Sequence, residues 1–273
     1  MPELPEVEVT RRGIAPHLEG CVVSAVVLRH SGLRLPFPPG LERKLAGRKI
    51  RSTGRRGKYL LIHFDHGALV LHLGMSGHLR ILPSSTEPRK HDHFDLVLGD
   101  RLLRLNDPRR FGLVQWHDAG DGCIEDHVLL RGLGVEPLEE KFSGGFLHAQ
   151  TRGRNAAIKQ VLLTGDIVVG VGNIYASESL FRAGIDPRRA ASRISLARYE
   201  KLAETIRETL AAAIEKGGSS LRDFVAADGQ SGYFQQTYFV YGRSGEPCRI
   251  CKMPIRQLTQ GQRSTFFCAN CQK

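Results

Sequence analysis

The spacing of apolar residues changes from helical to strand-like near residue 20. In residues 5–18, Val7, Ile14 and Leu18 fall on approximately one helical face and Pro5 suits a first turn, although Pro16 counts against the last turn. From about 20 to 117, short β-rich runs are broken by Gly, Pro, Asp and Asn. We expect strands at 22–28, 48–53, 59–64, 68–73, 94–98, 102–105 and 112–116. The pattern predicts an antiparallel sandwich or barrel with the N-terminal helix packed on it and residue 2 at its edge.

The second half of the chain has helical spacing. Residues 118–150 are mixed in composition and are expected to act as a connector, whereas 151–216 read as helices. Apolar residues recur at helical intervals over 195–216, and Gly217-Gly218 then forms a stop signal. Residues 217–241 are rich in Gly, Ser, Asp and Gln, which suits a mobile loop. The last thirty residues have almost no apolar core of their own, so they need a cross-link to hold them folded.

Composition and charge narrow the class of protein. A chain of 273 residues can bury a full core and is expected to form two domains. Its 39 basic residues exceed the 28 acidic ones, and the net charge of +11 favours a polyanionic partner, with nucleic acid as the first candidate. No apolar run is long enough to cross a membrane, and the N-terminus lacks the pattern of a signal peptide, so we expect a cytoplasmic protein.

Four of the six cysteines have the spacing of a zinc site. Cys248-x2-Cys251 and Cys268-x2-Cys271 are separated by sixteen residues. Four thiolates leave no open coordination position, so the spacing predicts one structural Zn²⁺ that staples a hairpin too small to fold alone. Alternation before the second cysteine pair would direct Arg263 from one face of that hairpin, where a solvated surface charge is the alternative. The other two cysteines, Cys21 and Cys123, are expected to be small buried apolar residues.

The first six residues carry candidate chemistry. Removal of Met1 would leave Pro2 with a free amine, and an α-amino group titrates near ~7.7–8, so it is partly neutral at working pH. A neutral amine can attack a carbonyl carbon, and the iminium formed by a proline is an electron sink. Glu3 and Glu6 could move protons around such an adduct. The alternative is that the prolines start a helix and the glutamates complement its dipole.

Several turns offer candidate contacts to nucleic acid. Gly170-Val171-Gly172 lacks the third glycine of a dinucleotide-binding fingerprint, so we reject that interpretation. The glycine turn precedes a helix that begins near Asn173, as in a helix–turn–helix whose N-terminus binds phosphate. The alternative is a turn that serves packing alone. Segments 73–77 and 107–112 present large side chains that could form a wedge in a base stack or, alternatively, belong to the core. These side chains are Met75, Arg110 and Phe111. His91-Asp92-His93 favours a polar network or a phosphate contact over a metal site, and Lys58 and His72 are phosphate candidates or solvated strand ends.

With these motifs assembled, the chain closely resembles the bacterial formamidopyrimidine-DNA glycosylase family, which repairs 8-oxoguanine. The resemblance covers essentially the full length and rests on motifs that occur in order. They are MPELPEVE at 1–8, RRGKYLL at 55–61, HLGMSG at 72–77, HDHFDLV at 91–97, DPRRFG at 107–112, VVGVGNIYASESLF at 168–181 and GQRSTFFC at 261–268. Leu4 favours the oxidised-purine branch over the related endonuclease VIII branch.

The resemblance implies an α+β fold in four parts. Residues 1–133 would form a catalytic antiparallel β-sandwich with an N-terminal helix, and 134–216 a helical, helix–two-turn–helix DNA-binding region. Residues 217–241 would be a mobile loop that caps the lesion, and 242–273 a four-cysteine β-hairpin zinc finger. The loop from Ser219 to Tyr233 would close over the flipped base.

The resemblance also implies roles for matching positions. Pro2 would attack C1′ of the damaged nucleotide, Glu3 would assist proton transfer and Glu6 would help hold the terminal segment. Lys58 and Arg263 are counted with these catalytic residues and, with His72 and Asn173, match the clamp on the phosphates that flank the lesion. Met75, Arg110 and Phe111 would fill the space left by the extruded base, with Arg110 facing the opposite cytosine. His91, Lys159 and Tyr233 complete the DNA contacts.

The implied function is excision of oxidised purines from damaged double-stranded DNA through a Pro2 Schiff base, followed by β,δ-elimination at the abasic site. A monomer with one structural zinc and no nucleotide cofactor or membrane partner is expected. The alternative is a non-catalytic, zinc-dependent DNA-binding protein that recognises distorted duplex. That alternative explains the charge and the cysteines equally well but gives no reason for the Pro2-Glu3 terminus.

Overall fold

The computed structural model describes residues 2–219 and 234–273, which form two compact units. The first unit comprises Met1–Arg131 with Lys216–Tyr233, and the second comprises Gly132–Glu215 with Phe234–Lys273. None of the described helices combines the length and apolar character needed to cross a membrane.

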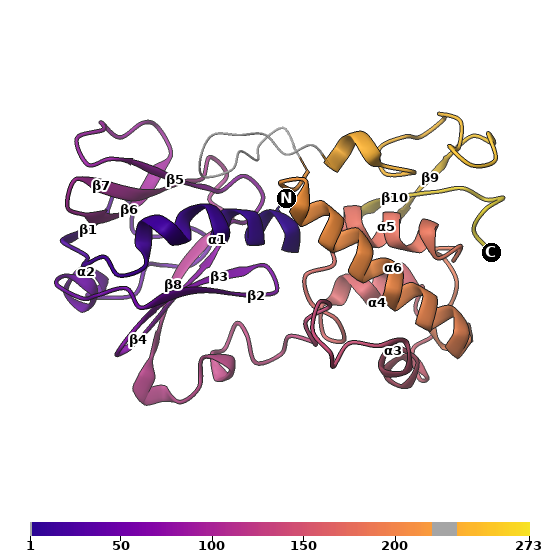
Figure 1. Cartoon of the computed structure of the whole chain (residues 1–273), viewed down its shortest axis with the longest axis horizontal. Coiled ribbons are helices and arrows are strands. Elements are labelled where there is room, and N and C mark those ends of the chain that lie inside the picture. The colour runs from indigo at the N-terminus through magenta and orange to yellow at the C-terminus, as the bar shows by residue number, and fades with distance from the viewer. Residues whose placement is uncertain (1, 220–233) are drawn as a thin grey trace. The chain divides into compact units, whose positions relative to one another are not determined.

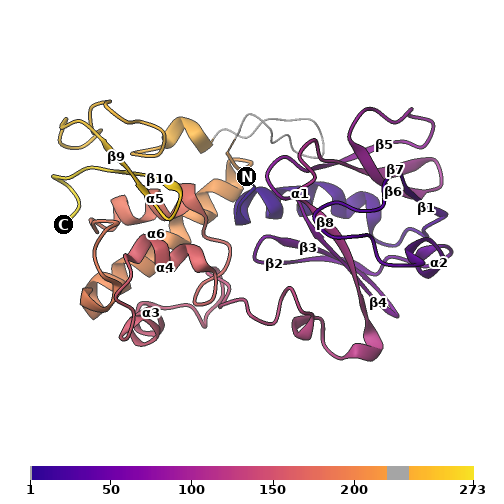
Figure 2. The ribbon, with the colours of Figure 1, turned by 180° about the vertical axis from the view of Figure 1, so that it is seen from behind.

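The first unit is a β-sandwich of two antiparallel four-stranded sheets. One sheet has the order β1-β6-β7-β5, formed by β1 (Ala25–Leu28), β6 (Asp92–Leu98), β7 (Arg101–Asn106) and β5 (His78–Pro83). The other has the order β2-β3-β4-β8, formed by β2 (Ser52–Arg56), β3 (Tyr59–Phe64), β4 (Gly67–His72) and β8 (Leu113–Asp118). Figures 1 and 2 show the sheets as separate layers. The predicted antiparallel sandwich is confirmed.

Helix α1 (Leu4–Leu18) supplies the N-terminal part of this core. It contacts β2, β3 and β5, and Val7, Ile14 and Leu18 are buried with side chains of both sheets in one apolar cluster. Pro16 lies in the last turn, and the helix ends two residues later, so the lost backbone donor costs little. The short helix α2 (Leu41–Leu45) packs beside β1 and buries Leu41 and Leu45.

Three strand predictions and one about the cysteines were wrong. Strand β5 was missed because His78 and Arg80 interrupt its apolar pattern, and Pro83 is tolerated there because β5 lies at the edge of its sheet. Strands β1 and β2 begin three and four residues after the expected positions, because the segments before them bond each other: the Val23 N–H donates to the Arg48 carbonyl and the Ile50 N–H to the Cys21 carbonyl, both at 2.9 Å. Cys21 is only half-buried and Cys123 is exposed, because Cys123 lies in the turn between the short 3-10 helices η1 (Ala119–Asp121) and η2 (Ile124–Asp126), where no sheet covers it.

The second unit combines helices with a β-hairpin. Its helices are α3 (Gly144–Thr151), α4 (Ile158–Thr164), α5 (Asn173–Arg182) and α6 (Leu196–Glu215), with short 3-10 helices η3 (Ala191–Arg193) and η4 (Phe234–Thr237). The hairpin consists of β9 (Arg256–Gln260) and β10 (Arg263–Phe267), and α5 packs against α4, α6 and β10. The predicted helix start at Asn173 and the long helix that ends before Gly217 are confirmed.

Candidate functional site

Pro2, Glu3 and Glu6 gather at the start of α1, and all three are buried. The Glu3 backbone N–H donates to Glu6 Oε2 at 2.9 Å, as in a capping box that satisfies helix-start donors. The second oxygen of this carboxylate accepts from the Ser219 backbone N–H at 2.8 Å. Glu6 therefore ties the first turn of α1 to the residue after Gly218, an arrangement that suits the holding role expected of it.

Lys58 and His72 lie close together at one end of β3 and β4. Lys58 occupies the turn before β3, and the strand register pairs Tyr59 with His72. The Gly74 N–H donates to His72 Nδ1 at 2.9 Å, which places the proton of the neutral ring on Nε2. Burial, and then the positive charges of Arg34 and Lys58, lower the pKa of His72 to about 4. His72 is thus a neutral donor at pH 7 beside a cation, a combination that can hold a phosphate.

Met75 and Phe111 project from two turns that are fastened to each other. The two side chains are 37% and 45% exposed, so the alternative that they belong to the core does not hold. The Ser76 hydroxyl donates to Asp107 Oδ1 at 2.7 Å, and Asp107 Oδ2 accepts from the Gly112 N–H at 2.8 Å. Because Asp107 is fully buried and bonds both turns, it fixes the backbone from which the two apolar side chains project. Side chains held in this way suit insertion into a stack of DNA bases.

The two arginines of the second turn diverge. The Arg109 guanidinium lies over the Phe111 ring, 4.9 Å from its centroid. Arg110 has a left-handed backbone, with φ of 54°, and its Nη1 donates to His30 Nε2 at 2.5 Å. Arg109 is therefore the arginine that accompanies Phe111, although the wedge role was predicted for Arg110.

His91, Asp92 and His93 divide between a polar network and the surface. Asp92 is buried and accepts from Asn106 Nδ2 at 2.7 Å, while His93 Nε2 donates to the Asp107 carbonyl at 3.1 Å. His91 has a left-handed backbone, with φ of 73°, and is only half-buried. The polar network that was favoured for this motif is present at Asp92 and His93, and His91 stays a candidate DNA contact.

In the second unit, two side chains hold the backbone next to Arg263. Asn173 Nδ2 and Lys159 Nζ each donate to the Ser264 carbonyl at 3.0 Å, and Lys159 Nζ also donates to Thr265 Oγ1 at 2.8 Å. Arg263 is exposed at the start of β10. Lys159 is completely buried, and its ammonium holds the strand that carries Arg263. The DNA contact expected of Lys159 stays a prediction.

Glu178, in the middle of α5, was not singled out from the sequence. Its buried carboxylate accepts from the backbone N–H groups of Phe239, Val240 and Tyr241 at 2.8, 3.0 and 2.9 Å. Burial raises the pKa of Glu178, and these hydrogen bonds only partly offset that effect. The residue thereby fastens the segment that leads into the cysteine hairpin to α5. The signal that could have revealed it is its place on the helical face of Ile174, Tyr175 and Phe181, at i−4, i−3 and i+3, which are all buried.

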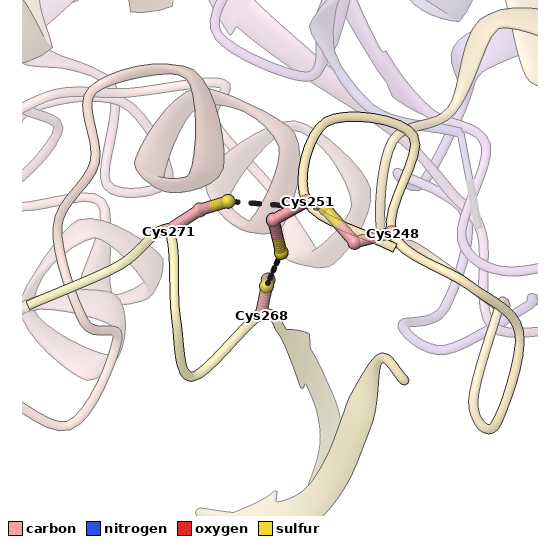
Figure 3. A group of neighbouring side chains, drawn as sticks. All are labelled: Cys248, Cys251, Cys268 and Cys271. Atoms are coloured by element: carbon pink, nitrogen blue, oxygen red, sulfur yellow. Dashed lines mark hydrogen bonds between the residues drawn. The ribbon is translucent and has the colours of Figure 1, made fainter. Parts of the chain in front are cut away.

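Cys248, Cys251, Cys268 and Cys271 converge on one point (Figure 3). All four sulfurs lie within 4.8 Å of one another, and the Cys248–Cys271 and Cys251–Cys268 pairs are 3.9 and 3.4 Å apart. A tetrahedral zinc with bonds of about 2.3 Å to sulfur separates its ligands by about 3.8 Å, so the cluster fits one zinc ion. The Met253 backbone N–H lowers the pKa of the Cys251 thiol to about 6, whereas burial raises the pKa of the Cys268 and Cys271 thiols, so those two would be deprotonated by the ion itself on binding. The predicted zinc-finger site is confirmed.

Comparison with known proteins identifies the family. Residues 1–114 match the formamidopyrimidine-DNA glycosylase N-terminal domain, 133–225 its H2TH domain, and 245–273 a zinc finger found in FPG and IleRS. The chain is 73% identical to the formamidopyrimidine-DNA glycosylase of Janthinobacterium sp. (strain Marseille) and 70% identical to that of Herminiimonas arsenicoxydans, in each case over all of both chains. It belongs to the formamidopyrimidine-DNA glycosylase family.

Solved structures of this family show the same fold. The MutM (Fpg) protein of Thermus thermophilus matches with a TM-score of 0.89 and 38% identity, over 99% of this chain and 98% of that one. A variant of the Lactococcus lactis Fpg, in complex with DNA that contains Fapy-dG, matches with a TM-score of 0.93 and 32% identity over all of both chains. The Lactococcus lactis Fpg in complex with DNA that contains an abasic site matches with a TM-score of 0.92 and 31% identity over all of both chains.

Each unit thus groups some of the predicted site residues of this family member. The first contains the α1 start, the Lys58–His72 pair and the wedge, and the second contains Asn173, Arg263 and the zinc cysteines. Tyr233 and most of the loop expected to cap the lesion lie outside the described residues. Arg109 was not singled out, because two adjacent arginines give no sequence signal of which one packs against the Phe111 ring.

Proposed function

We propose that this chain is a bifunctional base-excision-repair enzyme that removes oxidised purines, such as 8-oxoguanine and formamidopyrimidines, from duplex DNA and then cuts the strand at the abasic site. The observation that carries the proposal is the full-length similarity to formamidopyrimidine-DNA glycosylases, together with the burial of Pro2, Glu3 and Glu6 at one helix start. Complexes of the related Lactococcus lactis protein with Fapy-dG and abasic-site DNA support the substrate class. The enzyme acts as a monomer with one structural zinc and no nucleotide cofactor.

The chemistry starts at the amine of Pro2 once Met1 is removed. The amine attacks C1′, the bond to the base breaks, and Glu3 passes the proton that the departing base and the opening sugar require. The resulting iminium is positively charged, so the C2′ proton becomes acidic. Loss of that proton expels the 3′ phosphate, and a second elimination expels the 5′ phosphate, which leaves a one-nucleotide gap.

The same proposal assigns the DNA contacts. Lys58 and His72 of the first unit and Asn173 and Arg263 of the second hold the phosphates that flank the lesion, with His91 as a further contact. The lesion leaves the stack, at less cost than an intact base, while Met75 and Phe111 fill the space it leaves. One arginine of the Arg109–Arg110 pair faces the opposite cytosine. Separate Arg109→Ala and Arg110→Ala variants identify this arginine. Only loss of the arginine that contacts the cytosine should relax the preference for cytosine opposite the lesion.

The deciding experiment traps the covalent intermediate. Protein shown by mass spectrometry to begin at Pro2 is incubated with a duplex that carries 8-oxoguanine opposite cytosine, and borohydride is added. We expect a covalent protein–DNA complex whose attachment maps to Pro2, because borohydride reduces an iminium to a stable amine. Pro2→Gly, which keeps a free but primary α-amine, and protein that retains Met1 serve as the paired controls for the secondary amine and for its accessibility.

Two outcomes separate the proposal from its alternative. Trapping that is lost when Met1 is retained establishes the amine chemistry and leaves only the ranking of lesions to be measured. Tight binding without trapping or strand cleavage, from zinc-loaded protein that begins at Pro2, would favour the non-catalytic DNA-binding protein instead.

A further inference from the structure

His30 contacts the turn that carries Phe111 through the side chain of Arg110. His30 Nε2 accepts from Arg110 Nη1 at 2.5 Å, and the ring stands edge-on to His93 with 6.1 Å between centroids. His30, Arg109 and Arg110 line one cavity of about 360 Å³ together with Ser31, Gly32, Leu33 and Pro36. His30 therefore lies where the two arginines of the wedge turn separate.

The backbone of Arg110 explains why they separate. Its φ of 54° is left-handed, a conformation that residues with a side chain rarely adopt, and the Arg110 N–H donates to the Asp107 carbonyl at 3.2 Å. This kink sends the Arg110 side chain toward His30, while the Arg109 guanidinium remains 4.9 Å from the centroid of the Phe111 ring. A guanidinium only donates hydrogen bonds, so the contact requires a neutral imidazole with a lone pair on Nε2.

We propose that His30 is a positioning residue for recognition of the strand opposite the lesion: its ring holds Arg110 at the side of the turn, so that Arg109, and not Arg110, enters the duplex beside Phe111. The inference rests on the proposed function, since insertion of this turn into damaged DNA is part of it. Without the contact, Arg110 and Arg109 compete for the tip as two adjacent cations, and the turn loses the single geometry that distinguishes one opposite base from another.

The test measures binding, so it does not depend on turnover. Affinities of His30→Leu, His30→Gln and the unmodified protein are compared for duplexes with an uncleavable tetrahydrofuran abasic site opposite cytosine or adenine, by fluorescence anisotropy at one pH and salt concentration. His30→Leu removes the acceptor at similar size, and His30→Gln keeps an acceptor. The matched control is His148→Leu, which removes a like contact, Arg152 Nη1 to His148 Nε2 at 2.8 Å, on α3 of the other unit.

We expect the cytosine-to-adenine affinity ratio of His30→Leu to fall by roughly tenfold, the size of a hydrogen bond to a charged group. His30→Gln and His148→Leu should keep the ratio of the unmodified protein, because the first retains an acceptor for Arg110 and the second changes a contact in the other unit. An unchanged ratio in His30→Leu, or a ratio in His30→Gln that falls as far as in His30→Leu, overturns the inference. Borohydride trapping on a natural abasic site tests the proposed function separately.

Discussion

At the scale of single residues, buried polar and charged side chains fix the exposed ones that are proposed to contact DNA. Asp107 holds the turns of Met75 and Phe111, and Lys159 holds the strand of Arg263. A buried charge is costly unless hydrogen bonds satisfy it. The partners that satisfy these two charges lie on other segments, so the same bonds that lower the cost also set the position of a neighbouring functional group.

Lys159→Met tests this division of roles. The substitution keeps the bulk of the side chain but leaves the Ser264 carbonyl and the buried Thr265 hydroxyl with fewer donors. We expect the free energy of unfolding to fall by roughly 1–3 kcal/mol, the usual penalty for orphaned buried polar groups. The measurement is urea denaturation followed by circular dichroism.

The control is Thr265→Val, which removes the other partner of the same hydrogen bond. Because the two residues contact each other, the double variant should be less destabilised than the sum of the single ones. If Lys159 contacted a phosphate directly, its loss would instead lower the salt dependence of DNA binding by about one ion, and Thr265→Val would not.

At the scale of elements, an ionic network stabilises the β1-β6-β7-β5 sheet. Arg104 on β7 is almost completely buried and donates twice to Asp95 on β6, both at 2.8 Å, and Arg29 adds a third bond to the same carboxylate. Arg104 also donates to the carbonyls of Thr86 and Glu87 at 3.0 and 3.1 Å. The pair therefore fastens the segment that precedes His91 to the sheet.

Asp95→Asn should destabilise the protein by about 3 kcal/mol at pH 7, because it leaves the buried Arg104 guanidinium with only the more distant Asp92 carboxylate, at 3.5 Å, as a counter-charge. Burial alone would raise the pKa of Asp95, but the bonds from Arg104 and Arg29 outweigh it and lower the pKa. The stabilisation is then complete above the unfolded-state value near 3.9 and is lost as pH falls through the lower folded-state value. Denaturation at pH 7 and pH 3 should show the gap between Asp95→Asn and the unmodified protein narrow in acid.

Asp65→Asn is the control for that measurement. Its carboxylate bonds Arg51 at 2.6 and 2.7 Å, but both side chains are more than half exposed. A surface pair contributes roughly 0–1 kcal/mol, so the variant should differ little at either pH. If Asp65→Asn lowered the free energy of unfolding as much as Asp95→Asn, burial would not be the reason that the Asp95 network stabilises the protein.

The elements that the sequence predicts well are those whose apolar pattern reports one buried face. Helix α6 shows this, since Leu202, Ile206 and Leu210 are all buried and two glycines follow. Strand β5 could not be found in this way, because an edge strand accepts polar residues and a proline. Its place in the sheet comes from pairing with β7, which is remote in sequence.

The candidate site divides along the same line. The zinc cysteines could be predicted because the geometry of one ion dictates their spacing, whereas the role of Pro2 stays a prediction that rests on its position in the chain. The burial of Lys159 could not be predicted, since lysine is almost always exposed. The separation of Arg109 from Arg110 depends on one backbone angle, which two identical neighbours do not reveal.

At the scale of the whole molecule, the zinc site belongs to the second unit, whereas the chain's single tryptophan, Trp116, lies on β8 of the first. The hairpin has a small apolar cluster of which Cys248 and Cys268 are themselves members, so the hairpin depends on the metal for its core. Removal of zinc should therefore unfold residues 242–273 and lower DNA affinity by more than about tenfold, because the strand of Arg263 is no longer held. Trp116 emission should not change, because both sheets around it remain intact.

The experiment compares Cys271→Ser with Cys123→Ser, each at the same DNA concentration and salt. Cys271 is a zinc ligand, whereas Cys123 is exposed and outside the cluster, so only the first substitution should lower the zinc content, the circular dichroism signal and the affinity together. If the Trp116 emission of Cys271→Ser shifted with the loss of zinc, the β-sandwich would depend on the second unit for its fold. If affinity survived the loss of zinc, the hairpin would contribute nothing to DNA binding, and Arg263 could not hold a phosphate as proposed.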